Sequence, residues 1–259
     1  MTQEEYIPPS FLAIFAHPDD IEFSCAGTTA KWAKAGARAA YVLVTSGDVG
    51  IAEPGMTNER AAEIREAETL AAAKAAGVEE VVFLRVPDGM VENNIELRRR
   101  LVREIRRFRP ETIITGDPTI LFTTWGGVNH PDHRAVGGAV LDAVFPASGQ
   151  PNLFQEFEQE GLTAHKVRKI YVVSWTDGET VVDITETMET KINALAQHVS
   201  QIGHMEGLAE RMRERAADRA KDHDFEYGER FRVLTIESDE TWQRLQETYP
   251  EQYGGATGE

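Results

Sequence analysis

Two short clusters of histidine and aspartate carry the residue types best suited to metal-assisted chemistry. The first is His17-Pro-Asp-Asp20, and the second, far later in the chain, is Asn129-His-Pro-Asp-His133. Imidazole and carboxylate groups bind divalent metals and can also transfer protons. In a tight turn, His17 and Asp20 can converge on one point while Asp19 projects beside it. The first cluster alone could therefore offer two metal ligands and a base.

Each cluster taken singly also has a structural explanation. Asp and Pro are frequent in turns and at helix starts, so Asp132 could simply interact favourably with a helix dipole. Alone, either cluster is as readily structural as functional. Together they supply two histidines and a carboxylate, the ligand set typical of a catalytic zinc site that keeps one position for water. The pair of clusters therefore indicates a metal site.

The elements expected around the clusters alternate between strands and helices through most of the chain. The expected strands cover residues 11–16, 41–45, 81–85 and 112–115, and the expected helices cover 27–34, 59–76, 95–108 and 132–144. Such alternation predicts an α/β, Rossmann-like fold with a mostly parallel sheet and helices on both faces. In open sheets of this kind, ligands bind beyond the carboxyl ends of the strands. Both clusters follow expected strands, so both fall where a site is expected.

The chain changes character after residue 146. Residues 146–165 are polar and rich in turn residues, which indicates a long loop. The elements expected beyond it are strands at 169–174, 180–183 and 231–236 and helices at 186–201 and 207–222. Asp177-Gly178 between the first two strands is a hairpin turn signal. No long linker interrupts the chain, so we expect a single domain over residues 1–259 with a C-terminal extension of helices and a late strand from about residue 186.

Composition and charge exclude several classes of function. The 259 residues include 27 Lys and Arg against 43 Asp and Glu, a net charge of −16 that would repel a phosphate backbone, so no nucleic-acid partner is expected. The longest purely apolar run, residues 11–16, is far shorter than the ~18 residues that would span a bilayer. No signal-peptide pattern precedes it, and the single Cys25 fits a reducing compartment. We expect a cytoplasmic protein without a membrane span.

Other catalytic chemistries lack their motifs. The sequence has no Gly-x-Ser-x-Gly elbow, no Gly-x-Gly-x-x-Gly fingerprint and no phosphate-binding loop. Cys25 is interpreted as a small packing residue rather than a nucleophile. The basic cluster at 98–107 lies opposite an apolar stripe on the expected helix 95–108. We interpret it as a solvated helix face rather than a phosphate site.

The two motifs, in this order, resemble those of the LmbE-like, or PIG-L type, N-acetylglucosaminyl deacetylases, which are zinc-dependent amide hydrolases on a Rossmann-like fold. The similarity covers roughly residues 10 to 202. It extends to Thr45-Ser-Gly-Asp-Val-Gly50, Arg65-Glu-Ala-Glu68, Pro87-Asp88-Gly89, Val182-Asp-Ile-Thr185, Lys191 and His198-Val-Ser-Gln201. The resemblance implies that His17, Asp20 and His133 are ligands of Zn²⁺ and that Asp19 is the general base that takes a proton from the zinc-bound water.

The resemblance also implies roles for the second motif. His130 is expected to stabilise the tetrahedral oxyanion or to help protonate the leaving amine, and Asp132 is expected to orient His130 or stabilise its charge. The sequence departs from the family pattern at two places, one of which is Asp48, where Glu is frequent in the family. The other lies in the first motif. Many members continue the first motif directly with a third acid, whereas here Ile21 precedes Glu22, so no role is transferred to that acid.

Three further residues match family positions near the substrate. Arg65 and Asp88 are expected at the rim of the site, and His198 matches a recurring histidine that lines the pocket. For Arg65, an ion pair with Glu68 on the helix surface is nearly as well supported. These three residues complete the expected site.

The expected function is removal of the N-acetyl group from an N-acetylglucosamine-type amino sugar or its conjugate. Two alternatives remain open: a thiol-conjugate amidase of the same fold, and a metal- or sugar-binding module without turnover. The presence of Asp19 beside a complete ligand set argues against the binding module, because binding alone needs no base. Related folds often form homo-oligomers, and the sequence leaves the assembly state open.

Overall fold

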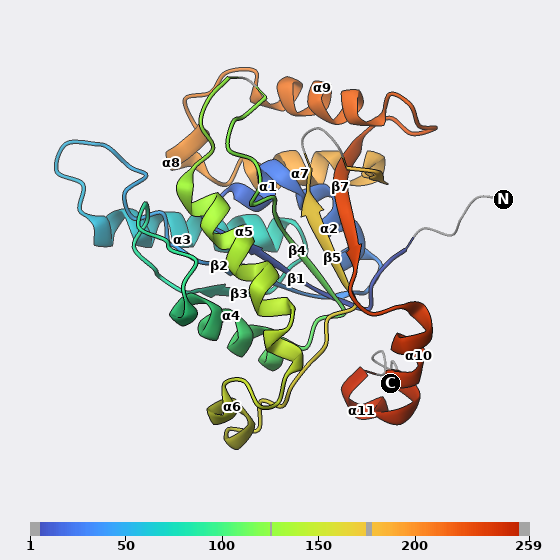
Figure 1. Ribbon diagram of the computed structural model, residues 1–259. Helices are drawn as coiled ribbons and strands as arrows, with labels where there is room; N and C mark the ends of the chain where they lie inside the picture. The colour runs from blue at the N-terminus through green and yellow to red at the C-terminus, as the bar shows by residue number, and fades with distance from the viewer. Residues whose placement is uncertain (1–5, 125, 175–177, 254–259) are drawn as a thin grey trace.

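The computed structural model describes residues 6–124, 126–174 and 178–253, and the strands of this part form a single sheet (Figure 1). The strand order is β3-β2-β1-β4-β5-β7-β6. The bounds are β1 Ser10–Phe15, β2 Arg38–Leu43, β3 Glu80–Phe83, β4 Thr112–Gly116, β5 Lys169–Val173, β6 Thr180–Asp183 and β7 Gly228–Thr235. Strands β1 to β5 are parallel, and β7 is antiparallel to both neighbours. The predicted α/β, mostly parallel sheet is confirmed.

Helices cover both faces of the sheet (Figure 1). One face carries α4 (Ile95–Phe108) and α5 (Pro131–Val144), and the other carries α2 (Ala26–Lys34), α3 (Asn58–Ala75), α7 (Met188–Leu195) and α9 (Leu208–Ala220). The remaining α-helices are α1 (Asp20–Ser24), α6 (Gln155–Gln159), α8 (Val199–Ile202), α10 (Asp239–Thr248) and α11 (Pro250–Tyr253). None of the described helices is long and apolar enough to cross a membrane.

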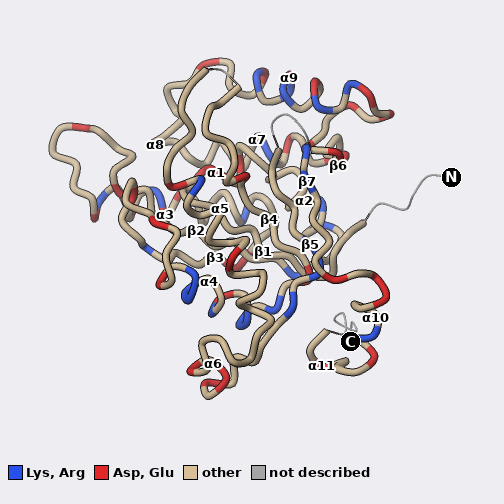
Figure 2. The backbone as a smooth tube through the Cα atoms, viewed as in Figure 1, with Lys and Arg blue, Asp and Glu red and all other residues tan. Residues whose placement is uncertain are grey.

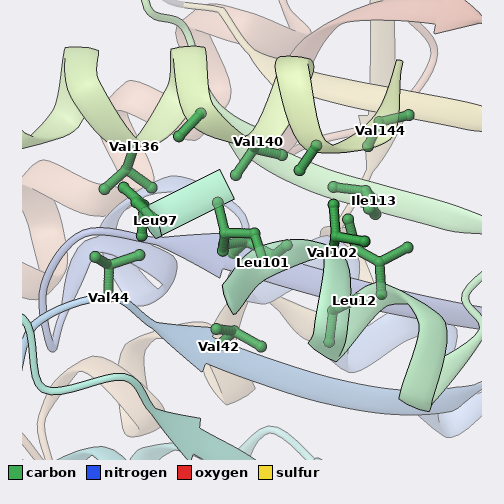
Figure 3. Close-up of a cluster of buried hydrophobic side chains, with 14 of the residues drawn as sticks. Leu12, Val42, Val44, Leu97, Leu101, Val102, Ile113, Val136, Val140 and Val144 are labelled. Atoms are coloured by element: carbon green, nitrogen blue, oxygen red, sulfur yellow. The ribbon is translucent and has the colours of Figure 1, made fainter. Parts of the chain in front are cut away.

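Strand β1 lies in the middle of the sheet because its side chains are apolar on both faces. All six of its residues are buried. Leu12 and Ile14 join the core beneath α4 and α5, where Figure 3 shows Leu12 facing Val102, whereas Phe11 and Phe15 join the core on the opposite face. A strand covered on both faces is apolar throughout rather than alternating. This burial fixes the carboxyl end of β1, from which the first histidine motif extends.

The basic face of α4 is a structural surface, as the sequence interpretation proposed. Four of its arginines lie 3.4 Å or less from carboxylates of neighbouring segments: Arg98 with Asp142, Arg99 with Glu156, Arg103 with Glu160 and Arg107 with Glu80. Arg106 differs because it is buried. Its guanidinium donates to the carbonyls of Ser148, Gln150 and Leu153 and so holds the segment before α6 against α4.

The expected hairpin between residues 169–174 and 180–183 is wrong. Strand β7 lies between β5 and β6 and pairs with both, so the two shorter strands run parallel to each other and cannot form a hairpin. Phe231 of β7 pairs with Val173 on one side and with Thr180 on the other. Strand β7 has eight residues, more than β5 or β6, and is long enough to pair with both of them. Asp177, half of the turn signal, lies outside the described residues.

The C-terminal helices dock against the loop before β5 through aromatic contacts. Tyr253 of α11 stacks on His165 at 5.4 Å between ring centroids and meets Trp242 of α10 edge-on at 5.3 Å. His165 is 1% exposed, and its Nε2 donates to the Pro110 carbonyl at 2.8 Å. Burial lowers the pKa of His165 to about 3, although the Pro110 carbonyl opposes the shift. His165 is therefore a buried neutral histidine.

We predict that His165 makes the fold sensitive to mild acid. The unfolded chain binds a proton at this histidine near pH 6.5, whereas the folded chain does so only near pH 3. The free energy of unfolding should therefore fall by up to about 1.4 kcal/mol per pH unit between these values. His165→Gln removes this loss. Denaturant unfolding of both proteins between pH 7 and 4.5 should give diverging curves, and parallel curves would contradict the assignment.

Candidate active site

The two histidine motifs meet beyond the carboxyl ends of the adjacent parallel strands β1 and β4. His17 follows β1 directly, and Asp20 begins the short helix α1. His133 lies in the first turn of α5, which β4 reaches through residues 117–130. Because β1 and β4 pair in parallel, both motifs emerge at the same edge of the sheet. The topology thus brings together residues that are far apart in sequence.

Three potential ligand atoms converge at this edge. The Nδ1 of His17 lies 3.1 Å from the Nε2 of His133 and 3.4 Å from a carboxylate oxygen of Asp20. The Nε2 of His133 lies 3.1 Å from the other oxygen of Asp20. These atoms lie within 4.8 Å of one another, close enough to bind one metal ion. The three residues named from the two motifs therefore form one candidate metal site.

In both histidines, the ring nitrogen that points away from the other candidate ligands (the outward nitrogen) faces a hydrogen-bond acceptor. The Nε2 of His17 lies 3.1 Å from Asp88 and 3.3 Å from Asp132, and the Nδ1 of His133 lies 3.0 Å from the side-chain oxygen of Asn129. Each outward nitrogen can therefore carry the proton. The inward nitrogen of each neutral ring then has a lone pair for a cation, as is usual for metal-binding histidines. This chemistry of the donor set fits a divalent metal.

A second possible group, formed by His17, His130 and Asp132, is less suited to a metal. Its carboxylate is fully buried and is already bound by His17 and by the backbone N–H groups of Gly89 and Val91. By contrast, Asp20 and His133 of the first group line an open cavity. The geometry therefore favours the first group.

The carboxylates around His17 control its charge. Burial opposes the charged ring, but hydrogen bonds with Asp132, Asp20 and Asp88 outweigh it and raise the pKa of His17 to about 12. The metal-free protein therefore favours a protonated His17. A metal ion binds the neutral ring, so binding has to release that proton.

Asp19 lies beside the candidate ligands in a strained conformation. Its φ of 89° is in the left-handed region, which a non-glycine residue adopts at a cost and mostly at functional sites. Burial and the charge of Asp20 raise the pKa of Asp19 to about 7, although Arg65 opposes the shift. A carboxylate with a pKa near neutrality is suited to accept a proton.

Arg65 holds Asp19 in place from the helix α3. Its guanidinium donates to the Asp19 carboxylate at 3.1 Å and to the carbonyls of Pro18 and Gly47 at 2.7 and 3.2 Å. A side-chain carbon at Gly47 or Gly50 would overlap this guanidinium, and Gly47 also has a φ of +65°. The glycines of the segment 45–50 thus make room for Arg65. The alternative ion pair with Glu68 is not formed, because Glu68 instead binds Ser200.

The three residues expected to contact substrate have little accessible surface. The side chains of Arg65 and Asp88 are each 5% exposed, and that of His198 is fully buried. His198 lies 3.2 Å from Glu22 of α1, and neither residue lines the cavity. In the structure, Arg65 contacts Asp19, Asp88 contacts His17 and His198 contacts Glu22. Contact of these three residues with substrate stays a prediction.

Sequence reasoning missed two groups that support the site. Asn129 orients His133 from four residues before it, and an Asn at this position beside a candidate ligand was the available signal. Glu229 of β7 accepts from the backbone N–H groups of Gly27 and Thr28, at the start of α2, and from Lys191 at 2.6 Å. No local pattern could have revealed Glu229, because its partners come from distant segments.

The site opens into a cavity of about 820 Å³. Asp20, His130 and His133 line it on one side, and residues of α9 and β7 line another part. His130 caps the start of α5 through a 3.3 Å hydrogen bond from the backbone N–H of Asp132, and its side chain is 42% exposed. Small-molecule sites commonly have volumes of about 300 to 1,000 Å³. The cavity can therefore hold a substrate larger than one sugar ring.

Comparisons with known proteins agree with this geometry. The family model described as "PIG-L: GlcNAc-PI de-N-acetylase" matches residues 12–144. The diacetylchitobiose deacetylase of Thermococcus kodakarensis is 30% identical over 190 residues, which cover 73% of this chain and 69% of that relative. A 1D-myo-inositol 2-acetamido-2-deoxy-alpha-D-glucopyranoside deacetylase of Nakamurella multipartita is 33% identical over 176 residues, which cover 56% of this chain and 57% of that relative.

The fold agrees as well. The structure of N,N'-diacetylchitobiose deacetylase from Pyrococcus horikoshii matches with a TM-score of 0.81 and 27% sequence identity, over 88% of this chain and 84% of that one. The chain therefore belongs to the PIG-L, or LmbE-like, family of GlcNAc deacetylases. As a member of this family, the chain is an N-deacetylase, which is an amide hydrolase.

We predict that replacing either histidine of the candidate metal site abolishes metal binding. We expect the dialysed wild-type protein to retain zinc and His17→Ala and His133→Ala each to lose it, as measured by elemental analysis. Asn129→Ala should weaken zinc binding by about 10- to 100-fold, the usual effect of removing a group that orients a ligand. The exposed His223→Ala serves as the control and should retain zinc. Full zinc content in either His17→Ala or His133→Ala would contradict the site.

Proposed function

We propose that the protein is a zinc-dependent deacetylase of an N-acetylglucosamine-type sugar or conjugate, with His17, Asp20 and His133 as the metal ligands. The observation that carries this proposal is the convergence of these three side chains beside Asp19 at the mouth of a large cavity. Two histidines and one carboxylate are a usual ligand set of hydrolytic zinc sites. Zinc held there would lower the pKa of a water ligand to about 7 and polarise the amide carbonyl.

Asp19 is the proposed general base. Its carboxylate accepts a proton from the water that attacks the acetyl carbonyl carbon, and its raised pKa makes this transfer favourable near neutral pH. The ion pair with Arg65 holds the carboxylate in place during the transfer. After the attack, the carbon–nitrogen bond breaks, acetate is released and the sugar amine leaves with a proton.

His130 is the second group proposed to act on the reacting amide. It lines the cavity, and its ring lies edge-on to His17 at 4.6 Å between centroids. From this position it can stabilise the developing oxyanion or give a proton to the leaving amine. Asp132 acts on His17 rather than on His130, since its carboxylate lies 3.3 Å from the His17 ring but 4.0 Å from His130. Asp132 is therefore assigned a positioning role.

We predict that Asp19→Asn separates metal binding from turnover. The amide keeps the size of the side chain but cannot accept the proton, so kcat should fall by about 10²- to 10⁴-fold while the zinc content stays unchanged. The matched control is Asp239→Asn, a change at an exposed aspartate of α10. Acetate release and elemental analysis on the same preparations provide the two readouts. Activity within a few-fold of wild type would place the base elsewhere.

The substrate class is tested with a panel of acetylated compounds. We expect the zinc-loaded protein to release acetate from N,N'-diacetylchitobiose or from another N-acetylglucosaminide, with the free amine as co-product. Cleavage of a cysteine S-conjugate amide without acetate release from any sugar would favour a thiol-conjugate amidase. Sugar binding without any turnover would favour a binding module. Either of these results would overturn the proposal.

A further inference from the structure

The cavity has a second wall that the proposed chemistry does not use. Arg215 and Arg219 of α9 and Arg230 of β7 line the same cavity as Asp20 and His133. Helix α9 lies above the end of the sheet, and Figure 2 shows basic and acidic residues alternating along it. The three arginines therefore face a space that is continuous with the candidate metal site.

The guanidinium groups on this wall lack the partners that arginines elsewhere in the molecule have. On α4, arginines pair with carboxylates of neighbouring segments. Within the described part of the chain, no ion pair is formed by Arg215, Arg219 or Arg230. Arg230 makes one long hydrogen bond, 3.5 Å to the Arg219 carbonyl, and its buried Nε has no partner. The wall thus presents guanidinium donors that are not engaged in ion pairs.

The positive charges on this wall also destabilise one another. Burial lowers the pKa of Arg219, and the charges of Arg215 and Arg230 add to this shift, whereas the charges of Glu229 and Asp218 oppose it. Glu229 is already engaged by Lys191 and two backbone N–H groups. A bound anion would relieve this repulsion and accept charge-assisted hydrogen bonds, whereas a neutral hydroxyl would only accept hydrogen bonds.

In the part of the chain that the structure describes, two carboxylates share this wall without forming an ion pair with its arginines. Glu214 and Asp218 of α9 also line the cavity, and both are exposed. Asp218 lies 3.6 Å from Lys221 one turn further along the helix. Neither carboxylate forms an ion pair with the three arginines among the described residues. The guanidinium donors therefore remain available to a ligand.

We propose that Arg215, Arg219 and Arg230 form a subsite for an anionic group, a carboxylate or a phosphate, on the part of the substrate that lies beyond the acetylated sugar. This inference rests on the proposed function. The cavity volume of about 820 Å³ leaves room for such a group when the acetamide lies at Asp20 and His133. The preferred substrate is then an acidic conjugate of N-acetylglucosamine rather than a neutral oligosaccharide.

The test compares three N-acetylglucosamine derivatives that differ only in the group at C1. The methyl glycoside is neutral, the glycoside of glycolic acid carries a carboxylate, and the 1-phosphate carries a phosphate. We expect kcat/KM for acetate release to be about 10- to 100-fold higher for at least one acidic derivative than for the neutral one. The derivative that shows the preference identifies which anion the subsite takes. A ratio near one for both acidic derivatives would overturn the inference.

Substitutions show whether the arginines cause the preference. Arg219→Gln and Arg230→Gln should each lower the ratio of acidic to neutral kcat/KM by about tenfold or more, and Arg219→Lys should retain part of it. Arg211→Gln is the matched control, because Arg211 lies on the same helix outside the cavity lining, and it should keep the wild-type ratio. Circular dichroism checks that each variant folds. A preference that survives both glutamine variants would also overturn the inference.

Calorimetric binding separates this inference from the proposed function. Tighter binding of an acidic derivative that depends on Arg219, with no acetate release from any sugar, would support the subsite and contradict the deacetylase assignment. Acetate release from all three derivatives at equal efficiency would support the deacetylase assignment and contradict the subsite. The two results therefore distinguish failure of the subsite from failure of the proposed function.

Discussion

The buried carboxylate of Asp132, together with that of Asp88, holds the Nε2 of His17 and so leaves its Nδ1 facing Asp20 and His133. It lies 3.3 Å from the His17 Nε2 and is held by the backbone N–H groups of Gly89 and Val91, so its own position is fixed. Without these two acceptors, the imidazole could turn its other nitrogen toward Asp20 and His133. The remainder of the site depends on this orientation, because a metal ion needs the lone pair of His17 at the point where the other two ligands converge.

A second constraint acts on Asp19. The left-handed backbone at Asp19 costs on the order of 1–3 kcal/mol, and the surrounding structure has to maintain it. Arg65 does so by binding both the Asp19 carboxylate and the Pro18 carbonyl. Gly47 and Gly50 in turn leave space for Arg65. The two glycines in the loop after β2 thus help to position Asp19, which follows β1. The ion pair between Asp19 and Arg65 offsets the backbone strain at Asp19.

Features set by local pattern could be predicted from the sequence, and features set by distant contacts could not. The apolar run in β1 and the periodic stripe of α4 predicted their elements, and the two histidine motifs predicted residues that the parallel sheet brings together. The insertion of β7 between β5 and β6 depends on pairing across the chain, which the turn signal near residue 178 did not reveal. Likewise, the burial of His198 and the cavity-facing arginines of α9 follow only from the packing of the C-terminal segment.

The most direct test of this arrangement is anomalous diffraction at the zinc edge from crystals of the zinc-loaded protein. The orientation of His17 by Asp132 predicts a single strong peak bonded to the Nδ1 of His17, the Nε2 of His133 and a carboxylate oxygen of Asp20, at about 2.0–2.2 Å from each. A peak bonded instead to the Nε2 of His17, beside His130 and Asp132, or no ordered peak near His17, would contradict it.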